Sequence, residues 1–270
     1  MKTVTVDGLR LYQFTQLSRE NSISHFVSTI HGGVSQGSYK SLNLGAYCED
    51  DPVAVRTNRQ RLANGLSIDV EKLVVPYQVH GVNMLKIDSS FLSLSAEEQN
   101  RQLYGVDALI TNQPEICIAV STADCVPLLL YSPEKQVVAA VHAGWRGTVG
   151  QIAQKVVLQL KKQFGCDPQT LFAGIGPSIC QHHFEVGEEV VDAFVAARQD
   201  MQSILSRHPK TQKAHIDLWK ANRLQLEEAG VPFKQIEMAC LCTVCQQEDF
   251  FSARRSGLLS GRMLSGIWMK

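Results

Sequence analysis

Ser121-Thr-Ala-Asp-Cys125 and, shortly after it, Val141-His-Ala-Gly-Trp-Arg-Gly147 frame the stretch that decides the fold of this chain. Around them lie three short runs of apolar or β-branched residues, typical of strands buried on both faces: 118–120, 126–131 and 137–141. Cys125 and His142 lie at the ends of these strands. The stretch predicts strand, turn, strand, tight turn and helix, a rigid frame that can hold reactive side chains.

Strands and helices alternate loosely along the rest of the chain. The patterns predict strands at 23–29, 73–79, 82–87, 171–175 and 235–240, and residues 105–111 lead into the central stretch. They predict helices at 52–64, 149–164, 188–197 and 218–229, with 199–214 irregular. The helix after Asp51 should end at Gly65, and the helix from Val149 at Gly165. We expect an α/β fold, with α+β as the alternative: a single three-layer domain over residues 1–270 with a mixed central sheet.

The composition excludes several classes of protein. Lys plus Arg (26) equals Asp plus Glu (26), so no net field favours nucleic acid or a membrane surface. No apolar run approaches the roughly 20 residues that span a bilayer, and the first residues lack the apolar core of a secretory signal. We therefore expect a cytoplasmic protein with no nucleic-acid or membrane partner, whose eight cysteines are reduced. The composition leaves the oligomeric state open.

Three side chains form the candidate site: His80, Cys125 and His142. Each follows a predicted buried strand and precedes a turn, and such strand ends can converge on one rim of a sheet. Two imidazoles and a thiolate suit a zinc ion whose fourth position stays open for catalysis, and Asp124 is a candidate to support a ligand. A metal-free alternative uses Cys125 as nucleophile and His142 as base.

Other polar residues are candidates for substrate binding or for metal. Arg146 begins a predicted helix, where an anion is already favoured. The triplet Cys240, Cys242 and Cys245 looks like half of a zinc knuckle, but a second pair of ligands is missing nearby. We interpret this triplet as structural or accidental, and His182–His183 as structural.

Three motifs give the chain a specific resemblance: Gln78-Val-His80-Gly81, Thr122-Ala-Asp-Cys125-Val-Pro127 and His142-Ala-Gly-Trp-Arg-Gly147. They resemble the signatures of the YfiH-like family, whose members are named laccase-domain proteins, polyphenol oxidases, purine nucleoside phosphorylases and peptidoglycan editing factor. Supporting matches run almost end to end. One departure is Ala253, where the family usually has an aromatic residue or His.

The resemblance implies an α/β domain similar to the cytotoxic-factor type of cysteine hydrolase, with zinc on the three candidate residues. It implies phosphorolysis of adenosine, inosine, guanosine and methylthioadenosine, and deamination of adenosine. Small-molecule partners are then a purine nucleoside and phosphate. Arg59 and Arg146 could serve the phosphate, and Asn43 the ribose or base.

Alternatives from other classes remain. The first is a cysteine hydrolase that acts on an amide in a peptidoglycan precursor. The second is a polyphenol oxidase with Cu²⁺ on the same residues, but a multi-copper cluster needs many paired histidines, and the chain has eight scattered ones. The third is a non-enzymatic metal-binding or partner-binding module.

Overall fold

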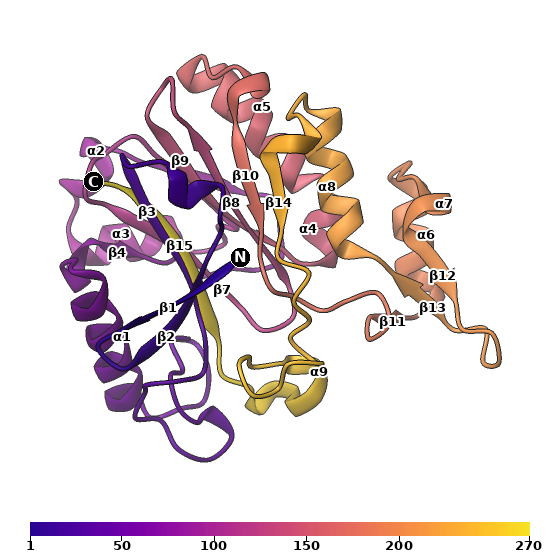
Figure 1. The fold of residues 1–270 in the computed structure, drawn as a ribbon, viewed down its shortest axis with the longest axis horizontal. Helices are drawn as coiled ribbons and strands as arrows, with labels where there is room; N and C mark the ends of the chain where they lie inside the picture. The colour runs from indigo at the N-terminus through magenta and orange to yellow at the C-terminus, as the bar shows by residue number, and fades with distance from the viewer.

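Two mixed six-stranded sheets form the centre of the molecule. A computed structural model describes residues 1–270, except for the side chain of residue 258 (Figure 1). The first sheet has the order β1(Lys2–Val6), β2(Leu9–Gln13), β3(Ile23–Ser28), β15(Met263–Met269), β7(Cys117–Thr122), β4(Leu73–Val74). The second has the order β14(Ile236–Met238), β10(Phe172–Ile175), β8(Val126–Ser132), β9(Val137–Ala143), β6(Ala108–Thr111), β5(Met84–Ile87).

The two sheets pack face to face, and helices cover their outer faces. Strand β8 shows why, since successive side chains of a strand point to opposite faces. Leu128 and Leu130 belong to the core under the helices, whereas Leu129 and Tyr131 belong to the core between the sheets. All four are fully buried, and each contributes about 1.5–3 kcal/mol of burial free energy.

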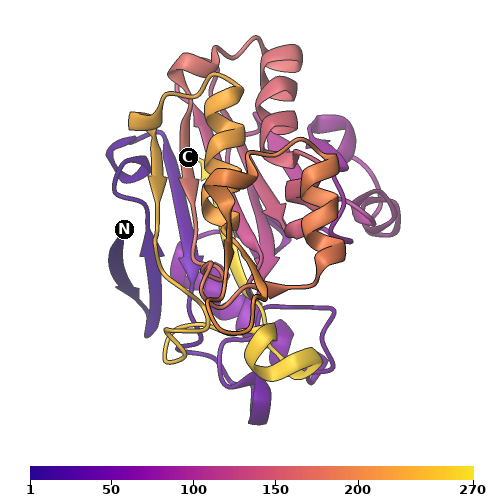
Figure 2. The ribbon, with the colours of Figure 1, turned by 90° about the vertical axis from the view of Figure 1, so that its right-hand side faces the viewer.

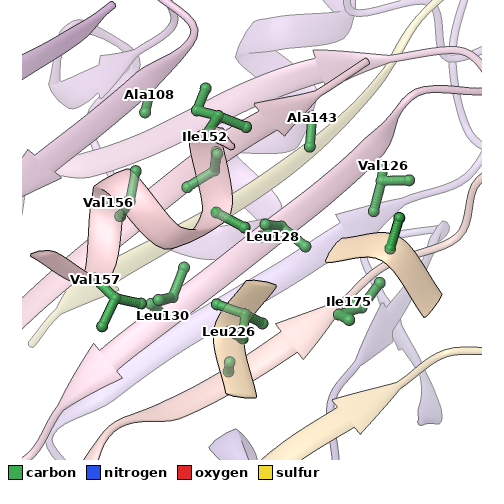
Figure 3. Close-up of a cluster of buried hydrophobic side chains, with 14 of the residues drawn as sticks. Ala108, Val126, Leu128, Leu130, Ala143, Ile152, Val156, Val157, Ile175 and Leu226 are labelled. Carbon is green, nitrogen blue, oxygen red and sulfur yellow. The ribbon is translucent and has the colours of Figure 1, made fainter. Parts of the chain in front are cut away.

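Helices α5(Ile152–Phe164) and α8(Leu218–Glu228) cover the second sheet, and α1(Pro52–Leu66) covers the first. Figure 3 shows Val156 and Val157 of α5 and Leu226 of α8 gathered against Leu128 and Leu130. Figure 1 shows α1 on the opposite side of the molecule from α5 and α8. The order of layers is therefore helix, sheet, sheet, helix.

The α/β class is confirmed, and the arrangement of its layers is a correction. One central sheet in three layers was expected, but the structure has two central sheets in four layers. A strand buried on both faces has the same sequence pattern whether its second cover is a helix or another sheet. The extent of the domain, residues 1–270, stays a prediction, which the pairing of β3 with β15 near the C-terminus supports.

The individual elements agree with the patterns in most places. The strands around residues 118–141 and the helices α1, α5, α6(Glu188–Ala196) and α8 lie where they were expected. Helix α1 begins at the Asp51 cap but ends with Ser67 in the left-handed conformation (φ 56°), so the expected end at Gly65 was wrong. A short helix, α4(Trp145–Val149), precedes α5, and Gly165 caps α5 as expected.

Other expectations were wrong. Only Leu73–Val74 of the strand predicted at 73–79 is formed, and 199–214 is not wholly irregular. That region contains α7(Met201–Ile204) and β12(Leu205–Arg207), and a three-stranded sheet has the order β11(Glu185–Val186), β13(Ala214–Ile216), β12. Strand β15 was not predicted. The remaining helices are α2(Ser89–Leu92), α3(Ala96–Leu103) and α9(Ala253–Ser256).

The chain crosses from one central sheet to the other between β7 and β8, in the turn of residues 123–125. Helix α9 lies at the lower end of the molecule in both views (Figures 1 and 2). Among the described residues, no helix combines the length and apolar character that a membrane span requires.

Candidate metal centre and active site

The structure brings the three candidate side chains together. Cys125 lies in the turn between β7 and β8, His142 lies near the end of β9, and His80 lies in the segment between β4 and β5. Their possible ligand atoms, two imidazole nitrogens and a sulfur, lie within 4.8 Å of one another. The rings of His80 and His142 meet edge to face, with centroids 4.8 Å apart. These donors and this spacing fit a zinc ion with three protein ligands.

Asp107 organises two of the three ligands. Its Oδ1 accepts hydrogen bonds from His142 Nδ1 (2.8 Å) and from the backbone N–H of His80 (3.0 Å). Its Oδ2 accepts from the backbone N–H of Gly81 at 2.7 Å. Because Nδ1 of His142 is engaged by the carboxylate, Nε2 is left as the metal-binding or proton-accepting atom, an arrangement typical of zinc-binding histidines.

Asp107 was not among the site residues predicted from the sequence. Ala108 on β6 pairs with Val141 on β9 in antiparallel register, which places Asp107 opposite His142. A polar residue directly before a buried strand was the available signal, but only the strand pairing makes it a partner of His142. Burial would raise the pKa of Asp107, but its hydrogen bond and ion pair with His142 hold that pKa below its ordinary value.

The backbone around the site is strained and closely packed. His80 (φ 63°) and Asp124 (φ 93°) both adopt the left-handed conformation, which is unfavourable for these residue types and concentrates at functional sites. Gly144 has no room for a side chain: an added Cβ would lie 2.8 Å from Cδ2 of His80 and 3.1 Å from Sγ of Cys125. The glycine therefore lets the three ligands meet.

Cys125 and His142 change each other's proton affinity. Burial would raise the pKa of Cys125, but the neighbouring His142 and His80 lower it to about 6. Burial would lower the pKa of His142, but the Cys125 thiolate and Asp107 raise it to about 9. Without metal, the pair is therefore a thiolate and an imidazolium near neutral pH. The thiolate is the form that both a metal and a nucleophilic mechanism require.

A pocket of about 480 Å³ opens at these three residues. It is lined by Tyr47 and Tyr77, which meet edge to face with centroids 4.5 Å apart, and Tyr104 stacks on Tyr77. Two arginines, Arg254 and Arg262, also line it. The pocket has the size of a small-ligand site and offers flat aromatic faces, cations and the candidate metal ligands.

The three residues expected to bind substrate do not line this pocket in the described part of the chain: Asn43, Arg59 and Arg146. Asn43 is fully buried, and its Oδ1 accepts from the backbone N–H groups of Gly45 and Arg262. Asn43 thus positions two residues that do line the pocket. Its direct contact with substrate stays a prediction.

The two expected arginines lie outside the pocket in different ways. Nε of Arg59 donates to the carbonyl oxygen of Leu44 at 3.0 Å, and burial lowers the pKa of this guanidinium. Arg146 is exposed and stacks on the ring of Trp145, at 4.2 Å from Cζ to the ring centroid. Contact of either with phosphate stays a prediction.

Asp124 has a different role from the expected support of a ligand. Its Oδ1 accepts from the hydroxyl of Thr243 and its Oδ2 from the backbone N–H of Arg254, each at 2.6 Å. It therefore ties the C-terminal segment to the turn that carries Cys125. Ala253, the departure from the family pattern, lines the pocket.

The Cys242–Cys245 pair does have partners, contrary to the expectation from sequence. Cys180 and His183 place their ligand atoms within 4.8 Å of one another and of both sulfurs. Cys240 is not part of this group. His183, which was interpreted as structural, therefore has three cysteine partners, and its structural role stays a prediction.

Comparisons with known proteins show which family the sequence matches and which solved structure shares the fold. Residues 24–270 match the family model described as "Multi-copper polyphenol oxidoreductase laccase". A "Purine nucleoside phosphorylase" of Bacteroides thetaiotaomicron is 47% identical over 99% of this chain and 98% of its own length. An "Adenosine deaminase RL5" from an unknown prokaryotic organism is 46% identical over 90% of this chain and 93% of its own length. The crystal structure of a Bacillus licheniformis hypothetical protein YfiH superposes with a TM-score of 0.88 at 30% identity, covering 97% of each chain.

Proposed function

This chain belongs to the family described as multi-copper polyphenol oxidoreductase laccase, and on that premise we propose that it is a zinc-dependent purine nucleoside phosphorylase that also deaminates adenosine. The resemblance to YfiH-like proteins predicted from the motifs is confirmed. The relatives named purine nucleoside phosphorylase and adenosine deaminase match nearly the whole chain. We propose adenosine, inosine, guanosine and methylthioadenosine as substrates, and the cytoplasm as the location.

Zinc is the metal that we propose for His80, Cys125 and His142. Two nitrogens and one sulfur within 4.8 Å of one another match the donors that zinc prefers. Asp107 accepts a hydrogen bond from Nδ1 of His142, and zinc-binding histidines are usually oriented by such a carboxylate. When bound, zinc would supply Lewis acidity to an oxygen atom of the substrate or of water. Cu²⁺ could bind the same donors. A laccase, however, needs a cluster of paired histidines, and both His/Cys groups found among the described residues contain cysteine.

Phosphate binding is the task that we assign to Arg254 and Arg262. Phosphorolysis replaces the bond between ribose and base with a bond between ribose and phosphate, so the pocket must hold a multiply charged anion beside a developing positive sugar. Arg254 already donates to the carbonyl oxygens of His183 and Glu185, which fixes its position. Arg262 is fixed by the carbonyl oxygens of Ser260 and Gly261. Each guanidinium has five N–H donors, so donors remain for phosphate.

Tyr47 and Tyr77 are the residues that we expect to hold the purine. Tyr47 is 63% exposed although it lines the pocket, so its ring is available to a ligand. A flat heteroaromatic base gains stacking energy on such a surface, and the stacking of Tyr104 on Tyr77 stiffens it. Base and phosphate would then occupy different parts of one pocket, with the sugar between them.

The meeting of His80, Cys125 and His142 in one pocket is the observation that carries the proposal. The test is an assay of the purified protein with inosine and phosphate, together with metal analysis. We expect phosphate-dependent release of hypoxanthine and ribose 1-phosphate, which is lost in Cys125→Ala. Product formation that does not depend on phosphate, or that persists in the variant, would contradict the proposal.

A cysteine hydrolase that edits peptidoglycan precursors is the second candidate, and one observation favours it. Asp107, His142 and Cys125 form an ordered series of orienting acid, base and nucleophile, and the pKa of Cys125 is lowered to about 6. Iodoacetamide distinguishes the two proposals. A free thiolate at Cys125 is alkylated at once, whereas a zinc-bound thiolate is protected until a chelator is added. Buried Cys117, whose pKa burial raises strongly, serves as the unreactive reference in the same digest.

A further inference from the structure

Two short ligand pairs, far apart in sequence, meet on the side of the pocket that faces the C-terminal segment. Cys180 and His183 are separated by two residues, as are Cys242 and Cys245. This spacing recurs in structural zinc sites because it lets both side chains of a turn point at one ion. The first pair follows β10, and the second lies between β14 and α9.

The distances within this cluster fit a tetrahedral ion. Nδ1 of His183 lies 3.3 Å from Sγ of Cys180, 3.7 Å from Sγ of Cys242 and 3.5 Å from Sγ of Cys245. Zn–S bonds of about 2.3 Å and Zn–N bonds of about 2.0–2.1 Å at the tetrahedral angle place nitrogen and sulfur about 3.6 Å apart. One imidazole nitrogen is thus nearly equidistant from three sulfurs. A disulfide would join two of these sulfurs and leave the third and the imidazole without a common partner.

The surroundings of the cluster suit a negatively charged metal complex. The backbone N–H of Cys180 points at Sγ of Cys242 (3.4 Å), a contact that favours the thiolate. Arg254 donates to the carbonyl oxygen of His183, and Arg255 donates to that of Thr243. Two guanidinium groups are therefore fixed on the two loops that carry the three cysteines, and their charge would offset the net negative charge of zinc bound by three thiolates.

The two loops have little regular structure to hold them together. Between them runs one isolated bridge, Ser178 to Cys242, with hydrogen bonds from Ser178 N to Leu241 O and from Thr243 N to Ser178 O. Both loops also contact Asp124, beside Cys125: Ile179 through its backbone N–H and Thr243 through its hydroxyl. A metal ion at the cluster would lock this wall of the pocket.

We propose that Cys180, His183, Cys242 and Cys245 form a second, structural zinc site, with all four positions filled by protein ligands. It differs from the centre at His80, Cys125 and His142, where three protein ligands leave one position open. The proposal does not depend on the reaction that the chain catalyses, and its tests do not use activity.

The first test is the zinc content of purified protein and three variants. We expect two zinc ions per chain in the wild type and one in Cys245→Ser. The matched control is Cys240→Ser, which also changes an exposed cysteine but one outside the ligand group, and it should keep both ions. Cys125→Ala should lose only the ion of the pocket.

The second test reads the ligands directly and does not require a folded variant at the cluster. Zinc-edge X-ray absorption of the doubly loaded wild type should report two sulfur ligands per zinc, the average of one and three. Cys125→Ala should report three. A wild type that binds a single zinc ion with one sulfur ligand would overturn the proposal, as would a Cys242–Cys245 disulfide in the zinc-loaded protein.

Discussion

Replacing Asp107 by Asn removes one charge and almost no volume, and it tests how far the site depends on that carboxylate. The carboxylate accepts hydrogen bonds from His142 Nδ1 and from the backbone N–H groups of His80, Gly81 and, at 3.4 Å, Val79. An amide offers one oxygen and an NH₂ group. Whichever way the amide is turned, an N–H donor faces another N–H donor.

The size of the effect follows from these contacts. A buried donor left without an acceptor costs about 1–3 kcal/mol, so Asp107→Asn should lower the free energy of unfolding by about 1–3 kcal/mol for each donor left unpaired. Loss of an orienting carboxylate typically weakens metal binding 10- to 100-fold, which equals about 1.4–2.7 kcal/mol. The two losses have the same cause, because the hydrogen bonds that hold the loop of His80 also fix the ring of His142.

Competition titration against zinc chelators of graded affinity measures the second effect, and thermal unfolding measures the first. Asp249→Asn is the control, since its carboxylate also accepts from a histidine, His31 at 3.0 Å, but does not line the pocket in the described structure. It should cost stability and leave the zinc affinity of the pocket unchanged. If Asp107→Asn binds zinc at His80, Cys125 and His142 as tightly as the wild type, the carboxylate does not organise the metal ligands.

Three further predictions concern packing, substrate binding and acid stability. Gly144→Ala places a methyl group 2.8 Å from the ring of His80, so we expect at least a tenfold loss of phosphorolysis and a loss of stability of about 1–3 kcal/mol. Normal activity would show that the site has room for this methyl group. Tyr77→Ala and Tyr47→Ala should each raise the KM for inosine, Tyr77→Ala by about tenfold or more, without changing the KM for phosphate. An equal rise in the KM for inosine and the KM for phosphate would contradict base stacking. Burial lowers the pKa of His25 to about 4, so protonation of the unfolded chain removes stability as the pH falls from about 6.5 to 4, by roughly 3 kcal/mol. In urea titrations at a series of pH values, the free energy of unfolding of His25→Asn should fall less steeply with acid than that of the wild type. An unchanged dependence of this free energy on pH would refute the assignment to His25.

Much of the fold was predictable because local patterns specify it. The apolar runs of β7, β8 and β9 are bounded by turns. Asp51 marks the start of α1 because its side chain accepts a hydrogen bond from the backbone N–H of Val53, and Gly165 marks the end of α5 because it adopts the left-handed conformation. Strand β15 was not predicted, because Ser265 and Gly266 interrupt its apolar pattern. The structure gives the reason for the glycine: a Cβ there would lie 2.6 Å from the ring of Phe26.

Cys125 and His142 were predictable because they lie at or near the ends of strands in the central sheets. His80 was predicted as the end of a strand, but it lies in the irregular segment between β4 and β5. The groups that support these residues depend on pairings that sequence spacing does not reveal. Asp107 meets His142 through the register of two antiparallel strands, 35 residues apart in sequence. Cys242 and His183 are 59 residues apart in sequence but lie together in the structure. The second pair of ligands, Cys180 and His183, was therefore not near the cysteine triplet in the sequence.

The most direct test of the central claim is a paired measurement on Cys125→Ala and the wild type: zinc content and inosine phosphorolysis on the same preparations. We predict that the variant lacks the zinc ion of the pocket, keeps the ion bound by Cys180, His183, Cys242 and Cys245, and cleaves inosine with phosphate at less than a hundredth of the wild-type rate. A variant that keeps both the wild-type zinc content and the wild-type rate would show that the three residues are not the catalytic metal centre.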